Sequence, residues 1–303
     1  METNNDSRPQ FGNRTLDNID NVYQHNAWDN VEWDEEYKAE VMKKIEANSD
    51  KKIDEKRAKE LQDSAGDYWD KFYEKHENKF FKDRHWLFTE FKELLPETKD
   101  LEVTNTLDSE TKTILELGCG VGNTVFPLLT IDNSDKLFIY CCDFSEKAIS
   151  LVKENSLYNT KRCHAFQFDL TSEEWSLPFS ESSLSIVTAI FVLSAIDPLY
   201  HQRIIKNISL YLKPGGKILF RDYGHLDLTQ VRFKAGQCIK NNFYVRGDGT
   251  RSYFFTPQQI DSLFINAGLK KINLHTDRRL QVNRANKKKM YRVWIQAKYF
   301  KPI

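Results

Sequence analysis

An apolar run that ends in three closely spaced glycines places the strongest constraint on the fold of this chain. The run covers residues 113–117, and Gly118, Gly120 and Gly122 follow at alternate positions. A run of this length is typical of a buried strand, and residues 123–129 predict a helix directly after the turn. Glycine lets the backbone approach a ligand closely, and a helix N-terminus presents free N–H groups. The turn therefore predicts a nucleotide-like ligand, with a plain strand-to-helix connection as the alternative.

Strand and helix patterns alternate after this turn, which favours an α/β fold with a mostly parallel sheet and helices on both faces. The other predicted strands cover residues 136–142, 163–168, 184–193 and 217–221. Ligands bind at the carboxyl edge of such sheets, where Asp143 and Asp169 follow the second and third strands. Asp143 stands 25 residues after Gly118, where a carboxylate can bind both hydroxyls of a ribose. The alternative role for both acids is helix capping.

The glycine spacing narrows the choice of ligand. Nicotinamide-dependent enzymes need a phosphate cradle and usually carry the pattern G-x-G-x-x-G, whereas the three glycines here are spaced G-x-G-x-G. The spacing favours a ligand without a pyrophosphate. A nicotinamide-dependent oxidoreductase is further disfavoured because no hydride-relay site is evident in the sequence.

Charge is balanced over the whole chain but unevenly distributed along it. Lys and Arg together number 44, as do Asp and Glu, so the net charge does not indicate a polyanionic partner. Residues 1–40 contain ten acids and three bases, whereas residues 270–303 contain eleven bases and one acid. This distribution predicts an acidic start and a basic terminal face, unless both are ordinary solvated surface.

Cysteine usage and hydropathy predict a cytoplasmic protein. The five cysteines form no C-x-x-C pair and lie in or beside apolar runs, as buried thiols in a reducing compartment do. No apolar run approaches the roughly 18 residues of a membrane span. Residues 1–10 are polar and acidic, unlike a targeting peptide. We expect neither a membrane segment nor a metal site.

Residues 1–64 predict an extension ahead of a main domain at residues 65–303. The extension has a polar start predicted to be disordered, an aromatic segment with Trp28 and Trp33, and then exposed linker helices. Tryptophans among amides and acids usually dock on another surface. That surface is either a substrate or partner, or the domain itself.

Helical patterns cover four stretches before the first strand of the sheet. The linker helices are predicted at residues 34–48 and 54–62. A third helix, around residues 68–73, places Trp69 and Tyr73 one turn apart on the same face. The fourth, at residues 84–95, carries an apolar stripe that predicts core packing.

The motif at residues 116–122, with Asp143 and Asp169, resembles the class I methyltransferases, which bind S-adenosylmethionine (SAM). The Leu-Lys-Pro-Gly-Gly turn at residues 212–216 is also similar to this family. The resemblance implies that Asp143 holds the ribose of SAM and that Asp169 and its neighbour Leu170 face the adenine.

Residues 190–195, 220–224 and 242–255 together resemble the methyltransferase-like family that forms 3-methylcytidine in the tRNA anticodon loop. The match begins near residue 11, and its opening is similar to the branch that modifies threonine tRNAs, at cytidine 32. The resemblance implies a SAM-dependent tRNA (cytidine-N3) methyltransferase with a tRNA-binding insertion at about residues 222–255. Its partner would be the anticodon stem-loop.

Other functions stay open at this point. The same chemistry could act on serine or arginine tRNAs together with a helper protein such as an aminoacyl-tRNA synthetase. A SAM-dependent enzyme could instead methylate a small molecule or a protein. An inactive SAM-fold subunit that positions a partner on RNA is disfavoured by the intact Gly118, Asp143 and Asp169.

The resemblance also implies contacts of the remaining cofactor residues. Trp69 and Tyr73 close over SAM, Gly118 lies under its methionine part with Gly120 in the same turn, and Ile190 contacts the adenosyl group. For the two aromatic residues, ordinary core packing is the alternative.

Cytosine N3 already carries an in-plane lone pair. Its methylation therefore depends more on alignment of N3 with the methyl donor than on a general base. The product is cationic until the exocyclic amine loses a proton. A carboxylate near the base could stabilise this charge, and Asp222, at the end of the fifth strand, is the candidate. The alternative is a salt bridge from Asp222 to Arg221 or Arg246.

Aromatic and basic residues predict the RNA surface, since flat rings suit base stacking and guanidinium groups suit phosphates. Without the resemblance, the aromatic residues of the insertion would be interpreted as core. The predicted RNA-binding residues are Trp28, Trp33, Arg232, Phe243, Tyr244, Arg246, Arg251, Tyr253, Arg278, Arg279, Lys287, Lys288 and Lys289.

Overall fold

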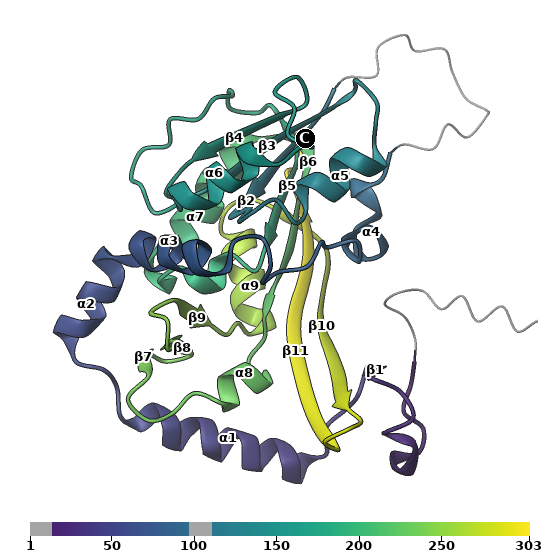
Figure 1. The fold of residues 1–303 in the computed structure, drawn as a ribbon, viewed down its shortest axis with the longest axis vertical. Helices are drawn as coiled ribbons and strands as arrows, with labels where there is room; N and C mark the ends of the chain where they lie inside the picture. Colours follow the sequence, from purple (N-terminus) through teal and green to yellow (C-terminus); the bar gives the residue numbers. More distant parts are fainter. Residues whose placement is uncertain (1–13, 97–110) are drawn as a thin grey trace, which may run out of the picture.

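The structure is a computed structural model that describes residues 14–96 and 111–303. The start that the sequence predicts to be disordered falls almost entirely in residues 1–13, outside the described residues. Within the described ranges, an eight-stranded sheet of order β1-β10-β11-β6-β5-β2-β3-β4 forms the centre of the molecule (Figure 1).

Five parallel strands make up one side of this sheet and confirm the five strands predicted from the sequence. They are β2 (Lys112–Leu117), β3 (Leu137–Asp143), β4 (Cys163–Gln167), β5 (Leu184–Ile190) and β6 (Leu212–Tyr223). The predicted strand at residues 184–193 is too long, because the chain leaves β5 at Ile190 and forms the 3-10 helix η3 (Leu193–Ala195).

Three antiparallel strands on the other side were missed by the sequence analysis. They are β1 (Ala27–Asp29), β10 (Lys270–Asn283) and β11 (Lys288–Phe300). The β10–β11 hairpin extends well beyond the end of the parallel strands, and β1 pairs with its far part (Figure 1). The residues that predicted a basic terminal face therefore lie mostly on a long hairpin of the central sheet.

Helices cover both faces of the sheet, and most begin at a side-chain cap. They are α1 (Glu35–Asp50), α2 (Glu55–Asp63), α3 (Ala65–His76), α4 (Leu87–Glu90), α5 (Val125–Ile131), α6 (Glu146–Glu154), α7 (Pro198–Tyr211), α8 (Leu228–Val231) and α9 (Pro257–Ile265). Short 3-10 turns, η1 (Ile19–Asn21) and η2 (Lys92–Leu94), complete the set. Asp197, before Pro198, caps α7 by accepting a hydrogen bond from Leu199 N, as proline at the first helical turn favours.

The predicted continuous helix at residues 84–95 is wrong. The chain forms α4, breaks at Phe91 (φ −126°, ψ 80°) and continues as η2. Phe88, Phe91 and Leu94 all enter the same buried cluster, so tertiary packing overrides the helical pattern.

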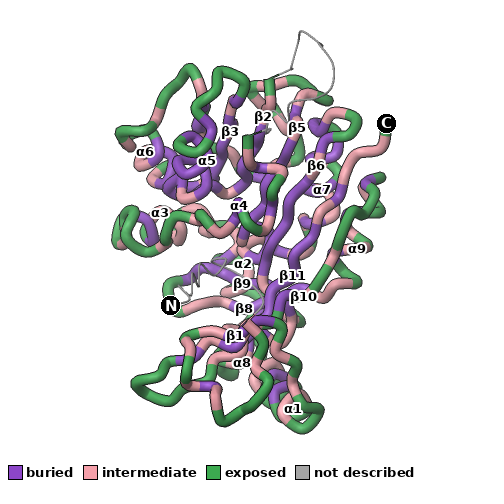
Figure 2. The backbone as a smooth tube through the Cα atoms, turned by 90° about the vertical axis from the view of Figure 1, so that its right-hand side faces the viewer, coloured by how far each residue is buried: buried purple, intermediate pink, exposed green. Residues whose placement is uncertain are grey.

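Side chains alternate between the two faces of the strands and build two cores. On one face, Leu115 and Val187 pack with apolar residues of α7 and α9. On the other, Ile114 and Ile186 pack with residues of α4, α5 and α6. The parallel strands are accordingly buried along most of their length (Figure 2), as expected for a parallel sheet with both faces covered.

Residues 49–64 are bound to the insertion after β6. The insertion contains α8 and a small sheet of β7 (Cys238–Lys240), β8 (Phe243–Val245) and β9 (Arg251–Tyr253). Ile53 N donates to Cys238 O at 2.9 Å, and Leu61 of α2 is fully buried in the main core. The segment that was predicted to be an exposed linker arm therefore contributes to the packing of the main domain.

Candidate functional site

A cleft of about 920 Å³ opens at the carboxyl edge of the parallel strands. The chain order reverses between β2 and β5, and ligands of doubly wound sheets bind at such a switch point. The walls come from the glycine turn, α3, the chain segments that follow β3 to β6, and the insertion. The cleft is therefore where the topology and the glycine motif both place a ligand.

The glycine turn after β2 forms the floor of one half of this cleft. Gly118 and Gly120 have φ values of +55° and +54°, which favour glycine. A Cβ on Gly118 would lie 2.5 Å from Val192 Cγ2, and one on Gly120 would lie 2.7 Å from the Tyr73 hydroxyl. The turn is thus a close-fitting cradle that larger residues would fill.

Asp143 connects the glycine turn to strand β3 through hydrogen bonds. Its Oδ2 accepts a hydrogen bond from Gly120 N at 2.9 Å, and its Oδ1 accepts one from Ser145 N at 3.0 Å. Burial raises the pKa of the carboxyl group to about 6, against the effect of these hydrogen bonds. The carboxyl group lines the cleft and is buried, as the ribose-binding prediction requires.

Helix α3 covers the same half of the cleft. Trp69 and Tyr73 stack with ring centroids 5.9 Å apart, and both line the cavity. Between them, Asp70 Oδ1 accepts hydrogen bonds from Ser145 Oγ at 2.5 Å and Lys147 N at 3.2 Å. Asp70 therefore anchors α3 to the start of α6, beside Asp143. The sequence analysis missed this residue.

Asp169 and Leu170 line the cleft after β4, where the sequence places them. Asp169 Oδ1 accepts hydrogen bonds from Thr171 N and Thr171 Oγ1, both at 2.8 Å. Ile190 differs from the prediction, because it is buried below the cleft and does not line it. The next two residues, Phe191 and Val192, line the cleft.

An ion pair below the glycine turn was also missed. Glu116, the acid of the motif, is fully buried at the end of β2, and its Oε1 lies 3.6 Å from Arg84 Nη1. Burial raises the pKa of Glu116 to about 7, although the nearby Arg84 favours the ionised form. Arg84 lines the cleft, so the pair places a buried titratable group next to the ligand site.

The prediction that Asp222 touches the substrate base is wrong for this structure. Asp222 is 0% exposed and does not line the cleft. Its Oδ2 accepts a hydrogen bond from Ser194 N at 2.9 Å, and its Oδ1 accepts one from Tyr223 N at 2.8 Å. The predicted salt bridge to Arg221 is wrong as well, because Arg221 pairs with Asp277. Burial raises the pKa of Asp222 to about 6, and the charge of Arg246 acts against this rise. Asp222 therefore fixes the backbone of two residues that do line the cleft.

The aromatic residues of the insertion do not form a stacking surface for RNA. Phe243, Tyr244 and Tyr253 are buried, because Phe243 and Tyr253 enter the main core and Tyr244 enters a separate cluster of the insertion. Tyr244 stacks on Phe233 with centroids 4.7 Å apart, and its hydroxyl lies 2.9 Å from Ser49 Oγ. Their assignment as RNA contacts is thus corrected to a structural role.

Two arginines of the insertion face the cleft. Arg246 Nη1 donates to Arg251 O at 3.2 Å, and its guanidinium carbon lies 5.8 Å from the centre of the Tyr223 ring. Arg251 is almost buried and donates to Gln62 Oε1 at 2.5 Å. Both side chains belong to the cleft wall and not to an outer RNA-binding face.

The N-terminal tryptophans have different environments. Trp28 is only 5% exposed, and its Nε1 donates to Val22 O at 2.8 Å. This burial contradicts its assignment as an RNA contact. Trp33 is partly exposed and packs edge-to-face on Tyr37 and Tyr291, with centroids 5.3 and 5.5 Å away.

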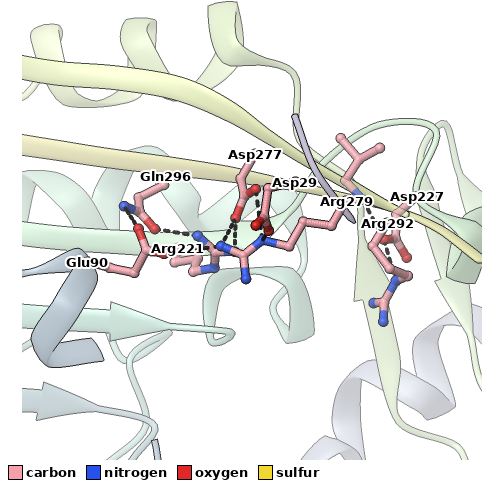
Figure 3. Close-up of polar contacts among 9 residues, drawn as sticks. Asp29, Glu90, Arg221, Asp227, Asp277, Arg279, Arg292 and Gln296 are labelled. Atoms are coloured by element: carbon pink, nitrogen blue, oxygen red, sulfur yellow. Dashed lines mark hydrogen bonds and ion pairs between the residues drawn. The ribbon is translucent and has the colours of Figure 1, made fainter. Parts of the chain in front are cut away.

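Arg279 is likewise a structural residue. Figure 3 shows that it lies among Asp29, Asp277 and Arg221 at the junction of β1, β10 and β6. A further ion pair joins it to Glu90 at 3.1 Å. The predicted RNA-binding residues that the structure leaves on the outer surface are Arg232, Arg278, Lys287, Lys288 and Lys289.

Comparisons with known proteins show the family of this chain. A family model described as a methyltransferase domain matches residues 115–218. The chain is 51% identical to the tRNA N(3)-cytidine methyltransferase METTL2 of Xenopus tropicalis, over 97% of this chain and 95% of that protein. It is 49% identical to METTL2 of Danio rerio, over 98% and 90%. The tRNA N(3)-methylcytidine methyltransferase trm140 of Schizosaccharomyces pombe is 44% identical, over 96% and 92%.

The sheet order, the glycine cradle and the matched domain define a class I SAM-dependent methyltransferase. The cleft fits this cofactor, because it combines a cradle that a Cβ would fill with a buried carboxyl group and two aromatic rings. The chain belongs to the tRNA N(3)-cytidine methyltransferase family, as residues 190–195, 220–224 and 242–255 predicted.

Two other kinds of site are absent from residues 14–96 and 111–303. No helix in these ranges is long and apolar enough to span a membrane. The same ranges hold no group of three or more His, Cys, Asp or Glu residues that could bind a metal ion.

Proposed function

We propose that this chain methylates N3 of cytidine 32 in the anticodon loop of threonine tRNAs, with SAM as the methyl donor. The observation that carries the proposal is the 51% identity, over nearly the full length of both chains, to a relative named as a tRNA N(3)-cytidine methyltransferase. The choice of threonine tRNAs rests on the resemblance of residues 20–29 to that branch of the family. The five cysteines are buried and unpaired thiols, which supports the cytoplasm as its compartment.

In this proposal, one half of the cleft holds the cofactor. Gly118 and Gly120 cradle the methionine part, Asp143 binds the ribose hydroxyls, and Asp169 and Leu170 face the adenine. Trp69 and Tyr73, fixed through Asp70, exclude water from the same half. The other half lies toward Tyr223, Arg246 and Arg292 and is left for the target nucleotide.

SAM supplies a methyl group activated by its sulfonium, so that an N–C bond forms at N3 as the S–C bond breaks and the electron pair stays on sulfur. The cytosine then carries a positive charge until a proton leaves its N4 amine for solvent. The protein therefore needs to align N3 and exclude water, which requires no general base. A base in a duplex cannot be reached in this way, so an unpaired or flipped loop nucleotide is the natural substrate.

Nucleoside mass spectrometry of purified threonine tRNAs from a strain that lacks the protein tests the function. We expect 3-methylcytidine at position 32 to disappear and to return with the wild-type gene. An unchanged level in threonine tRNAs, together with a loss in serine or arginine tRNAs, would contradict the substrate choice. Purified protein alone and protein with threonyl-tRNA or seryl-tRNA synthetase added would show whether a helper protein is needed.

Asp143 gives a prediction about pH and cofactor binding. Its carboxyl group takes up a proton as the pH falls through about 6, and only the ionised form can accept both ribose hydroxyls. We expect SAM affinity to fall by up to about tenfold per pH unit below that value and to level off above it. Asp143→Asn should weaken binding by about 1–3 kcal/mol and remove the pH step.

Calorimetric titration of the free protein with SAM measures both effects. Glu116 has a pKa of about 7 and titrates nearby, so Glu116→Gln serves as the matched control and should keep the step that belongs to Asp143. If the SAM affinity of the wild-type protein is the same in both protonation states of Asp143, this residue does not bind the ribose.

The exposed lysines of the β10–β11 hairpin are the proposed phosphate contacts. Lys287, Lys288 and Lys289 are all exposed at its tip. Changing all three lysines to glutamine should reduce the slope of log tRNA affinity against log salt concentration. The reduction should correspond to the loss of up to about three phosphate contacts. The control neutralises Lys153, Lys161 and Lys206, which are exposed on other elements. Equal slopes for the two triple variants would show that the hairpin tip is ordinary solvated surface.

A further inference from the structure

The residue after β5 has a backbone conformation that bulky side chains rarely adopt. Phe191 has a φ of +59°, and its N–H donates to Arg221 O at 2.8 Å, so the neighbouring strand β6 holds this conformation in place. Large residues in the left-handed region are costly and concentrate at functional sites. This makes Phe191 a candidate for a role that its side chain performs in the cleft.

The turn at Phe191 places its ring at the boundary between the two halves of the cleft. The next residue, Val192, packs so closely on Gly118 that a Cβ there would lie 2.5 Å from it, which fixes one side of the turn against the cofactor cradle. On the other side, the Phe191 and Tyr223 rings have centroids 5.1 Å apart at 48°. The Phe191 ring lines the cleft between these two contacts.

Guanidinium groups cover the other aromatic rings in this part of the cleft. Arg246 lies over Tyr223 at 5.8 Å, and Arg292 lies over Trp294 at 4.9 Å. Arg221 lies over both Trp86 and Trp294, at 5.1 and 4.9 Å. Among the described residues, no cation lies over the Phe191 ring. Phe191 packs partly against the core below β5 and keeps part of its surface exposed where it lines the cleft.

We propose that Phe191 is the residue on which the target cytosine stacks, and that its ring stabilises the positive charge which the base acquires at N3. This inference rests on the proposed function. An aromatic face attracts a cation more than a neutral ring, so the contact strengthens as the methyl group is transferred. Arg246 and Arg292 face the same half of the cleft and suit the flanking phosphates, because a guanidinium close to the base would oppose the developing charge.

The decisive comparison uses Phe191→Leu and Phe191→Tyr. Leucine keeps an apolar side chain without a π face, whereas tyrosine keeps the ring. We expect the single-turnover rate on threonine tRNA, at saturating SAM, to fall by about 3- to 30-fold in Phe191→Leu and to stay within about threefold in Phe191→Tyr. Phe138→Leu is the matched control, because Phe138 is partly exposed on β3 and does not line the cleft. It should keep the wild-type rate.

A binding measurement separates stacking on a cation from ordinary packing. Anticodon stem-loops that carry cytidine or protonated 3-methylcytidine at position 32 are titrated without SAM. The ratio of the affinity for the methylated, cationic loop to the affinity for the neutral loop should be larger for wild type than for Phe191→Leu. SAM affinity should be unchanged in both variants. If Phe191→Leu does not fold, Phe191→Met replaces it, since methionine also lacks a π face.

Three results would overturn the inference. Wild-type rates in a folded Phe191→Leu or Phe191→Met variant would show that the ring is not needed. An equal loss of SAM affinity would assign Phe191 to the cofactor half. An unchanged preference for the cationic loop would remove the charge argument. Failure of the proposed function looks different, because wild type itself would then form no 3-methylcytidine in threonine tRNA.

Discussion

Replacing Trp28 with alanine is expected to lower the free energy of unfolding by about 3–5 kcal/mol. Trp28 lies in β1 opposite Leu280 of β10, and it packs with Val22, Leu280 and Val282 in a separate buried cluster. Its removal leaves a cavity and also takes away the Nε1 donor that satisfies Val22 O. The arm is thus expected to act as a structural clasp and not as a contact for the substrate loop.

Trp33→Ala is the comparison for this prediction. Trp33 is partly exposed and contacts Tyr37 and Tyr291 only through ring edges, so its loss should cost about 1 kcal/mol. Urea unfolding of both variants, with tRNA affinity measured under native conditions, gives the answer. A Trp28→Ala variant with wild-type stability and weakened tRNA binding would show that the arm grips the substrate.

Breaking the buried ion pair between Arg221 and Asp277, behind the cleft, should destabilise the protein by as much as Trp28→Ala. Arg221 and Asp277 are both buried, and the Arg221 guanidinium also bonds Gln296 (Figure 3). The same guanidinium lies over the rings of Trp86 and Trp294. Asp277→Ala leaves Arg221 without its carboxylate in a nearly dry site, which should destabilise the protein by about 3–5 kcal/mol. Trp86 and Trp294 line the cleft, so methyl transfer should also fall.

The double variant Arg221→Met, Asp277→Leu separates these two effects. Replacing both charges with apolar groups is often nearly neutral for stability, so this variant should recover most of the lost free energy. Its activity should remain low, because the guanidinium that packs on both tryptophan rings is absent. Thermal melts and single-turnover assays on the same samples provide the measurement. Equal stability of Asp277→Ala and wild type would show that Glu90 compensates for the missing carboxylate.

The parallel half of the fold could be predicted because its signals are local. A buried strand followed by Gly118, Gly120 and Gly122 is sufficient to place the cradle, and Asp143 follows from its distance along the chain. The β10–β11 hairpin could not be predicted in the same way. Val293, Ile295 and Ala297 do alternate in β11, but the polar and charged residues 275–279 interrupt the apolar pattern of β10.

The orientation of side chains in the insertion could not be predicted from the sequence either. Phe243 and Arg246 are three positions apart, yet one is fully buried and the other faces the cleft. Which residue faces inward depends on how the small sheet packs against α1 and α8, and that packing is not local. The left-handed φ of Phe191 had no sequence signal either, because it is imposed by the hydrogen bond to β6 and by the packing of the next residue, Val192, on Gly118.

The pairing of β1 with β10 has a consequence for synthesis. Asp29 lies opposite Arg279, which is 250 positions later in the chain, so the outer strand of the sheet cannot form until β10 has been translated. The parallel strands and their helices can assemble earlier, while Trp28 and Val22 stay exposed to solvent. The nascent chain therefore leaves the ribosome with an apolar N-terminal segment that needs the last strands to be covered, and a chaperone has this interval in which to bind it.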